Sequence, residues 1–119
     1  MTNNNDPHLS GHLERNSALW LEWLKEGVVE TKELTVDFHF SAARERLAIA
    51  LERVLVAEGF KVTITPKRTA LIFKAWSVEA SETALWSLER LQFRTRQLYD
   101  AASSVGMHLE GLGATMPSN

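Results

Sequence analysis

The sequence predicts one α+β domain, in which a four-stranded antiparallel sheet carries two helices on one face and an extra helix precedes the first strand. Three observations lead to this prediction. Four short segments alternate apolar and polar residues, which is the period of a half-buried strand. Two longer segments repeat apolar residues at every third or fourth position, which is the period of an amphipathic helix. The six segments follow one another as strand, helix, strand, strand, helix and strand in a chain of 119 residues, enough for one hydrophobic core.

The N-terminal part is predicted to hold an asparagine-rich, disordered leader over residues 1–12 and a short helix over about residues 16–27. Asn16 or Ser17 can cap this helix by accepting hydrogen bonds from free backbone amides. The residues that share one face of it are Trp20, Trp23, Leu24 and Gly27. We expect this face to dock on the main body, and a partner or dimer surface is the alternative.

The first strand has the most regular pattern. The stretch LTVDFHF places leucine, valine and phenylalanine on one side, and Thr35, Asp37 and His39 on the other. Ser41 follows as the expected N-cap of a helix that ends at Gly59, where a left-handed residue is wanted. The residues that this helix is expected to bury are Leu47, Ala50, Leu51, Val54 and Leu55.

The second and third strands are expected to form an antiparallel hairpin, because too few residues separate them for a helix. The stretch FKVTITP alternates from Phe60, and Pro66 stops the pairing because proline has no amide hydrogen to donate. The stretch TALIFKAWSVE, residues 69–79, alternates less clearly, as a strand buried on both faces does.

A long helix and a closing strand complete the domain. Ser81 is the predicted N-cap of the helix, with Glu82 in its positively polarised first turn and Gly106 at its end. Its expected apolar stripe runs through Leu85, Leu88, Gln92, Thr95, Leu98 or Tyr99, Ala102 and Val105. The stretch MHLEGLGATM is the last strand, and its GLG predicts a bulge or bend. The domain is expected to span residues 13–116, with 117–119 as a frayed tail.

This order of elements is that of the ferredoxin-like βαββαβ plait, with an expected strand order of 4-1-3-2. Right-handed crossovers place both helices on one face of the sheet and leave the other face open. The residues expected on the open face are Asp37, His39, Lys61, Thr63, Thr65, Lys74, Trp76, His108 and Glu110. Water, the tryptophan helix and a partner protein are the three alternatives for what covers this face.

The open face also suggests an alternative function. His39, His108, Asp37 and Glu110 offer imidazole and carboxylate groups, which divalent metals accept, so a ligand- or metal-binding module is the alternative to a regulator. These residues have no recognised ligand spacing, and no cofactor is predicted. No nucleophile can be placed beside a base, and no glycine-rich loop joins a strand to a helix, so no enzyme is predicted.

The composition limits which binding partners and which cellular compartment are expected for this chain. The net charge is −2, and Trp76 is the single aromatic residue expected on the open face, which is a poor platform for stacking bases, so direct nucleic-acid binding is not expected. The chain has no cysteine, no apolar segment typical of a signal peptide and no run long enough to cross a membrane. We therefore expect a cytoplasmic protein. Its partner is expected to be another protein, and a homodimer is left open.

A second surface is predicted on the long helix. Trp86 and Phe93 are seven residues apart, hence on one side of the helix, with Arg90 and Arg94 beside them. Aromatic and arginine side chains are typical of protein-binding hot spots, so this arginine–aromatic ridge is a predicted docking surface. The alternative is that the two rings flank the core and the arginine stems lie over them.

Two stretches resemble the regulator of ribonuclease E activity B (RraB-like) family. These are FHFSAARERLAIALERVLVAEGFKV and LQFRTRQLYDAASSVGMHLEGLGA, within a likeness that covers roughly residues 34 to 115. The matching residues are His39, Ser41, Ala42, Gly59, Phe60, Val62, Gly106, Glu110, Gly111 and Gly113. Leu112 stands where the closing motif of the family has an aromatic residue. The resemblance implies the same fold and a non-enzymatic protein that binds an endoribonuclease, or its degradosome scaffold, and lowers its activity.

Overall fold

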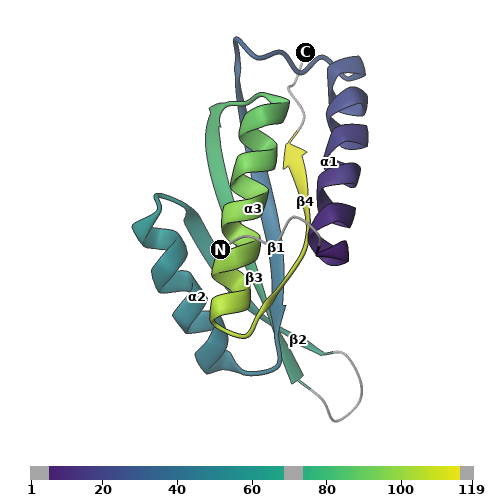
Figure 1. Ribbon diagram of the computed structural model, residues 1–119. Helices are drawn as coiled ribbons and strands as arrows, with labels where there is room; N and C mark the ends of the chain where they lie inside the picture. The colour runs from purple at the N-terminus through teal and green to yellow at the C-terminus, as the bar shows by residue number, and fades with distance from the viewer. Residues whose placement is uncertain (1–5, 69–73, 116–119) are drawn as a thin grey trace.

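The computed structural model describes residues 6–68 and 74–115 and has an α1 helix followed by a βαββαβ unit (Figure 1). The four strands pair in the order β2-β3-β1-β4, and every pair is antiparallel, which confirms the predicted plait. The elements are α1 (Pro7–Lys25), β1 (Glu33–Ala42), α2 (Glu45–Ala57), β2 (Lys61–Arg68), β3 (Lys74–Leu85), α3 (Leu88–Ser104) and β4 (His108–Thr115). Predictions for residues 1–5, 69–73 and 116–119 lie outside the described residues.

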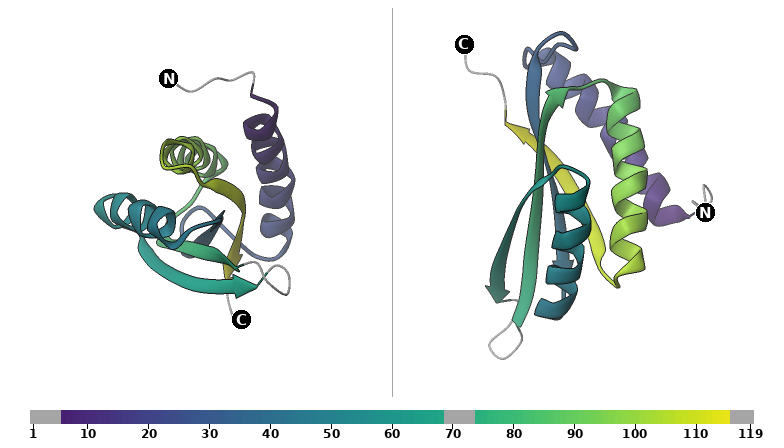
Figure 2. Two further views of the ribbon diagram at one scale, coloured as in Figure 1. Left: turned by 90° about the horizontal axis from the view of Figure 1, so that it is seen from below. Right: turned by 90° about the vertical axis from the view of Figure 1, so that its left-hand side faces the viewer.

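All three described helices lie on one side of the sheet (Figure 2). Helix α1 runs beside α3 near the β4 edge, and its two tryptophans belong to the common core. The expected docking of Trp20 and Trp23 on the main body is therefore confirmed, since their exposed fractions are 6% and 5%. Because α1 joins the helix layer, it leaves the opposite face of the sheet uncovered.

Strand β1 forms the centre of the core, as its alternation predicts. Its inward residues Leu34, Val36, Phe38, Phe40 and Ala42 are all buried, and three of them have no exposed surface. At about 25 cal/mol per Å² of apolar area removed from water, burial of such side chains is the main stabilising term for the sheet. The polar residues between them face the side without helices.

Strand β4 contains a β-bulge. Its register against β1 shifts between His39 and Phe40, and Glu110 is the extra residue. The bulge inverts the alternation, so Leu109 and Leu112 both pack on the helix side of the sheet. The bulge predicted at GLG therefore falls one residue earlier, and GLG itself is paired strand.

The long helix starts later than predicted. Residues 81–85 continue β3, because this strand keeps pairing with β1 as far as Leu85 opposite Glu33. The true N-cap is Ser87, whose side chain accepts a hydrogen bond of 3.1 Å from the backbone amide of Arg90. Leu85 is consequently an exposed strand residue and not part of the helix stripe. Gly106 follows α3 with a positive φ of 78°, as expected.

The other two helices also differ in their bounds from the prediction. Helix α1 begins at Pro7, because the carboxylate of Asp6 caps the amides of His8 and Leu9, so residues 7–12 are helical and not a leader. Ser41 lies inside β1, and α2 starts at Glu45 after an N-cap without a side-chain hydrogen bond. Val54, expected in the core, is 37% exposed.

Candidate protein-interaction surface

The face of the sheet without helices carries a row of polar pairs between β1 and β3. The hydroxyls of Thr35 and Thr83 are 2.7 Å apart. The Ser81 hydroxyl donates to Oδ1 of Asp37 over 2.7 Å. These pairs follow from the register, in which the residues lie directly opposite each other on the central strands. They hold the side chains of the open face in fixed positions.

His39 belongs to the same row. Its Nδ1 lies 3.8 Å from Oε2 of Glu79, and the two side chains are 42% and 47% exposed. On the β4 side, the residues opposite Asp37 and His39 are Gly113 and Gly111. Since glycine has no side chain, this part of the sheet presents backbone and leaves the row accessible from one flank. Strand β2 adds Lys61, Thr63 and Thr65 on the other flank.

The structure places the remaining predicted members of the open face only partly as expected. His108 is exposed and pairs in register with Ser41, and Glu110 is exposed in the bulge. Neither lies directly opposite His39. Within residues 6–68 and 74–115, no three histidine or carboxylate side chains gather closely enough to hold a metal ion, so the alternative metal site gains no support.

Trp76 and Lys74 were predicted on the open face, and this is wrong. Trp76 pairs with Ala42 and Pro66, which puts it in the phase of the core, and it packs against the core with part of its ring exposed. Lys74 shares this phase. The pattern was ambiguous here, because the alternation of the third strand is weak before Val78.

The predicted arginine–aromatic ridge does not form. Trp86 precedes the helix and is 1% exposed, and its Nε1 donates to the backbone carbonyl of Leu34 over 3.0 Å. Phe93, by contrast, is 64% exposed. The two rings are separated because the helix starts at Leu88, so the spacing of seven residues does not apply to them. Only Phe93 remains as an exposed aromatic group of the predicted ridge.

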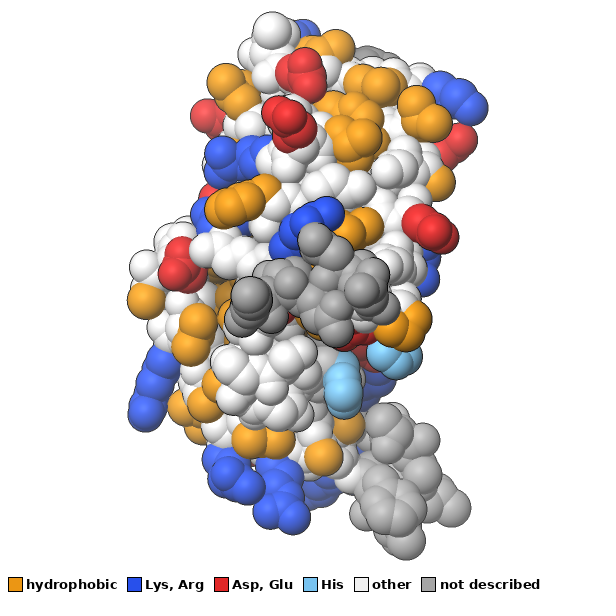
Figure 3. Space-filling view, viewed as in Figure 1, with side chains coloured by type: hydrophobic (Ala, Val, Ile, Leu, Met, Phe, Trp, Pro, Cys, Tyr) orange, Lys and Arg blue, Asp and Glu red, His pale blue; other side chains and the backbone are white. Residues whose placement is uncertain are grey.

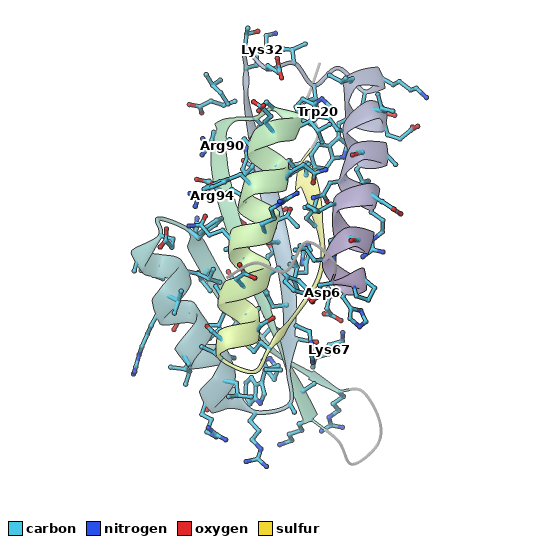
Figure 4. All side chains as sticks on the ribbon, viewed as in Figure 1. Asp6, Trp20, Lys32, Lys67, Arg90 and Arg94 are labelled. Carbon is cyan, nitrogen blue, oxygen red and sulfur yellow. The ribbon has the colours of Figure 1, made fainter. Side chains whose placement is uncertain are left out.

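The two arginines of the ridge are instead bound to one carboxylate. Glu82 accepts from Nη2 of Arg90 at 3.0 Å and from Nε and Nη2 of Arg94 at 3.0 and 2.8 Å. The guanidinium groups also lie over aromatic rings, that of Arg90 over Trp86 at 5.0 Å and that of Arg94 over Phe60 at 4.9 Å. Arg90 and Arg94 project from the same flank of α3 (Figure 4). The alternative expectation, that both rings flank the core under arginine stems, holds for Trp86 with Arg90 over it. It is wrong for Phe93, which is exposed, because the ring beneath Arg94 is that of Phe60.

This cluster could not be read from the sequence, because Glu82 was assigned to a helix. Its side chain and that of Arg94 are each only 14% exposed, so the charges are largely desolvated. The Nε of Arg90 is buried without a hydrogen-bond partner among the described residues. The cluster is therefore a structural element that fixes α3 to the sheet, and it leaves little free charge for a partner.

The flank of α3 that faces α1 is joined by neutral polar groups. Nδ2 of Asn16 donates to Oε1 of Gln92 at 2.9 Å and to the hydroxyl of Thr95 at 2.8 Å. Nε2 of Gln92 donates in turn to the backbone carbonyl of Leu13 at 2.9 Å. Asn16 is 2% exposed and Thr95 is fully buried, so these bonds satisfy groups that water does not reach.

At one end of this seam, the pKa values of His12 and Tyr99 are shifted from their ordinary values. Burial is the main cause that lowers the pKa of His12, and the charge of Arg15 adds to it. Nδ1 of His12 lies 3.1 Å from the Arg15 guanidinium. Burial and a hydrogen bond to Asp6 raise the pKa of Tyr99, whose hydroxyl donates to Oδ2 of Asp6 over 2.8 Å. These contacts hold the start of α1 in place.

The fold and the open face define a small α+β protein with three helices on one side of a four-stranded sheet and exposed polar groups on the other. Residues 14–114 match the family described as Regulator of ribonuclease activity B (RraB), and the chain belongs to this family. The family consists of non-enzymatic regulators of RNase E activity that act by protein binding. A comparison with curated proteins found no match. No helix in the described part of the chain is both long and apolar enough to span a membrane.

Proposed function

We propose that this chain binds RNase E, or the scaffold protein that holds it, through the open sheet face, and that binding lowers the activity of the ribonuclease. The observation that supports this surface is the row of exposed polar pairs on the two central strands, centred on Asp37 and His39. Side chains on paired strands are held more precisely than side chains on loops, which favours specific recognition. A cytoplasmic location is part of the proposal, since the chain has no cysteine.

The charge of this face favours a protein partner. Asp37 and Glu79 provide carboxylates, Lys61 provides a cation, and the threonines provide neutral groups. A face of mixed sign is typical of the polar part of a protein interface, whereas a nucleic-acid surface is strongly basic. Phe93, which is exposed on the side of the helices, marks the alternative contact surface.

The test measures binding of the purified chain to full-length RNase E by calorimetry and its effect on RNA cleavage. The double variant Asp37→Ala with His39→Ala is expected to weaken binding about tenfold or more, as loss of central interface residues does. A matched control removes one carboxylate and one imidazole on the helix side, through Glu14→Ala with His8→Ala. It is expected to bind as the wild type does.

A third variant, Phe93→Ser, separates the two surfaces. If the open face is the contact, this variant binds normally and inhibits normally. Loss of binding in Phe93→Ser alone, or equal loss in the open-face variant and its control, would contradict the proposed surface. Thermal melting of each variant shows that it is folded before binding is compared.

A further inference from the structure

The end of the sheet next to the β2–β3 connection collects positive charge from three separate segments. Helix α2 begins three residues after the last β1 residue, and the end of β2 pairs with the start of β3 beside the end of β1, so the three segments meet at one end of the sheet. Their cations are all exposed: Arg44, Arg46, Lys67, Arg68 and Lys74. In the face shown in Figure 3, the lower end of the molecule carries Lys and Arg side chains and no Asp or Glu. We name these five residues the basic end.

A tryptophan lies within the basic end. Trp76 lines a surface hollow together with Pro66, Lys67, Arg68 and Lys74. All four tryptophans of the chain lie in its described part, and the other three are at most 6% exposed. Trp76 alone keeps part of its ring at the surface, and its pairing with Ala42 and Pro66 on the sheet fixes its position.

The charges of the basic end are available for a ligand. Within residues 6–68 and 74–115, none of the five cations takes part in an ion pair, whereas Arg90 and Arg94 do. The nearby carboxylates are Glu45, the first residue of α2, and Glu110, which lines a neighbouring hollow with Lys67. Five cations against two carboxylates give a local positive excess on a chain whose net charge is −2.

We propose that the basic end binds single-stranded RNA. Cations that neutralise phosphates, arranged around an exposed aromatic ring on which a base can stack, are the combination that single-strand binders use. A duplex would leave the indole unused, because its bases are already stacked. An acidic protein segment would pair with the cations, but it carries no repeating planar group that could stack on the indole ring of Trp76. The expectation of no nucleic-acid binding rested on the net charge and on the open face. Of the basic end, Lys67 shares the phase of that face, whereas Arg68, Lys74 and Trp76 have the phase of the core.

The proposal is tested with the purified chain alone, so its failure does not affect the proposed binding of RNase E. The probe is a fluorescein-labelled oligouridylate of about 12 nucleotides, followed by fluorescence anisotropy. With three to five phosphates neutralised, affinity is expected to fall about 20- to 130-fold between about 50 and about 200 mM salt. The variant Lys67→Ala, Arg68→Ala, Lys74→Ala is expected to lose at least about tenfold in affinity at the lower salt.

The matched control is the triple variant Lys25→Ala, Lys32→Ala, Arg53→Ala, which removes the same amount of positive charge elsewhere on the surface. Lys32, for example, lies at the opposite end of the molecule from Lys67 (Figure 4). This control is expected to bind the oligonucleotide as the wild type does. Trp76→Leu, checked for folding by its melting temperature, is expected to weaken binding about tenfold, the typical loss of one stacked base. An oligoglutamate peptide serves as a competitor. Absence of salt-dependent binding by the wild type, equal loss in the control, or preference for oligoglutamate over oligouridylate would overturn the proposal.

Discussion

Helix α3 makes two different polar contacts on its two flanks. On the flank toward α2, Arg90 and Arg94 bind the carboxylate of Glu82. On the flank toward α1, Gln92 and Thr95 accept hydrogen bonds from Asn16. Both flanks are polar contacts at the edge of one core. The first depends on opposite charges that have left water, and the second on neutral hydrogen bonds. A charged contact of this kind stabilises only while all its members are present, because a single desolvated charge without its partner costs more than the pair contributes.

This difference determines how substitutions in each of the two contacts should affect the stability of the domain. The α2 flank fixes the helix to a strand that lies under it, since Glu82 belongs to β3. The α1 flank fixes the helix to an element outside the βαββαβ unit. We therefore expect damage to the first contact to destabilise the whole domain, and damage to the second to act mainly through α1.

The largest effect is expected from Glu82→Ala. This change leaves Arg94, whose side chain is 14% exposed, without the carboxylate that accepts two of its hydrogen bonds. The free energy of unfolding, measured by urea denaturation, should fall by about 3 kcal/mol. Glu79→Ala on the open face is the control, because its side chain is 47% exposed, and it should change stability by less than about 0.5 kcal/mol.

A triple variant sharpens this prediction. If Glu82→Leu is combined with Arg90→Met and Arg94→Met, no charge is left unpaired, and most of the lost stability should return. A triple variant no more stable than Glu82→Ala would show that the geometry of the cluster, and not the unpaired charge, is what matters.

A smaller effect is expected from Asn16→Ala. It removes the donor to Gln92 and Thr95 and leaves the buried Thr95 hydroxyl without this partner, so the free energy of unfolding should fall by about 2 kcal/mol. In a double-mutant cycle with Thr95→Val, the coupling energy should exceed about 0.5 kcal/mol. Strictly additive losses would mean that the bond between these two side chains contributes nothing to stability.

Much of the fold was predictable because β1 alternates without interruption, and every inward residue of it is buried. The start of α3 was not predictable from local signals, since Ser81 and Ser87 are both good caps. Pairing of β3 with β1 decides between them, and that is a long-range effect. The open-face positions of Asp37 and His39 followed from the alternation of β1. The predicted arginine–aromatic ridge is wrong for the same reason as the predicted start of α3. With Ser87 as the N-cap, Trp86 precedes the helix and is buried in the core.

The histidine of the α1 seam gives the third and smallest effect, which depends on pH. The groups around His12 are Arg15 and His8 from its own helix, Tyr99 from α3 and the backbone of Leu109 in β4. Burial first, and then the positive charge of Arg15, hold the pKa of His12 below its ordinary value of 6.5. The unfolded chain therefore binds a proton near pH 6.5 that the folded chain does not yet accept.

The sign of the effect follows from this difference. The contribution of His12 to stability is fully present above pH 6.5 and is lost as the pH falls from 6.5 toward the lower pKa of the folded state. Urea denaturation at a series of pH values between about 7.5 and about 5 should show this loss, and His12→Gln should remove most of the slope. If His12→Gln and the wild type lose stability equally on acidification, His12 is not the group that makes the contact between α1 and α3 sensitive to pH.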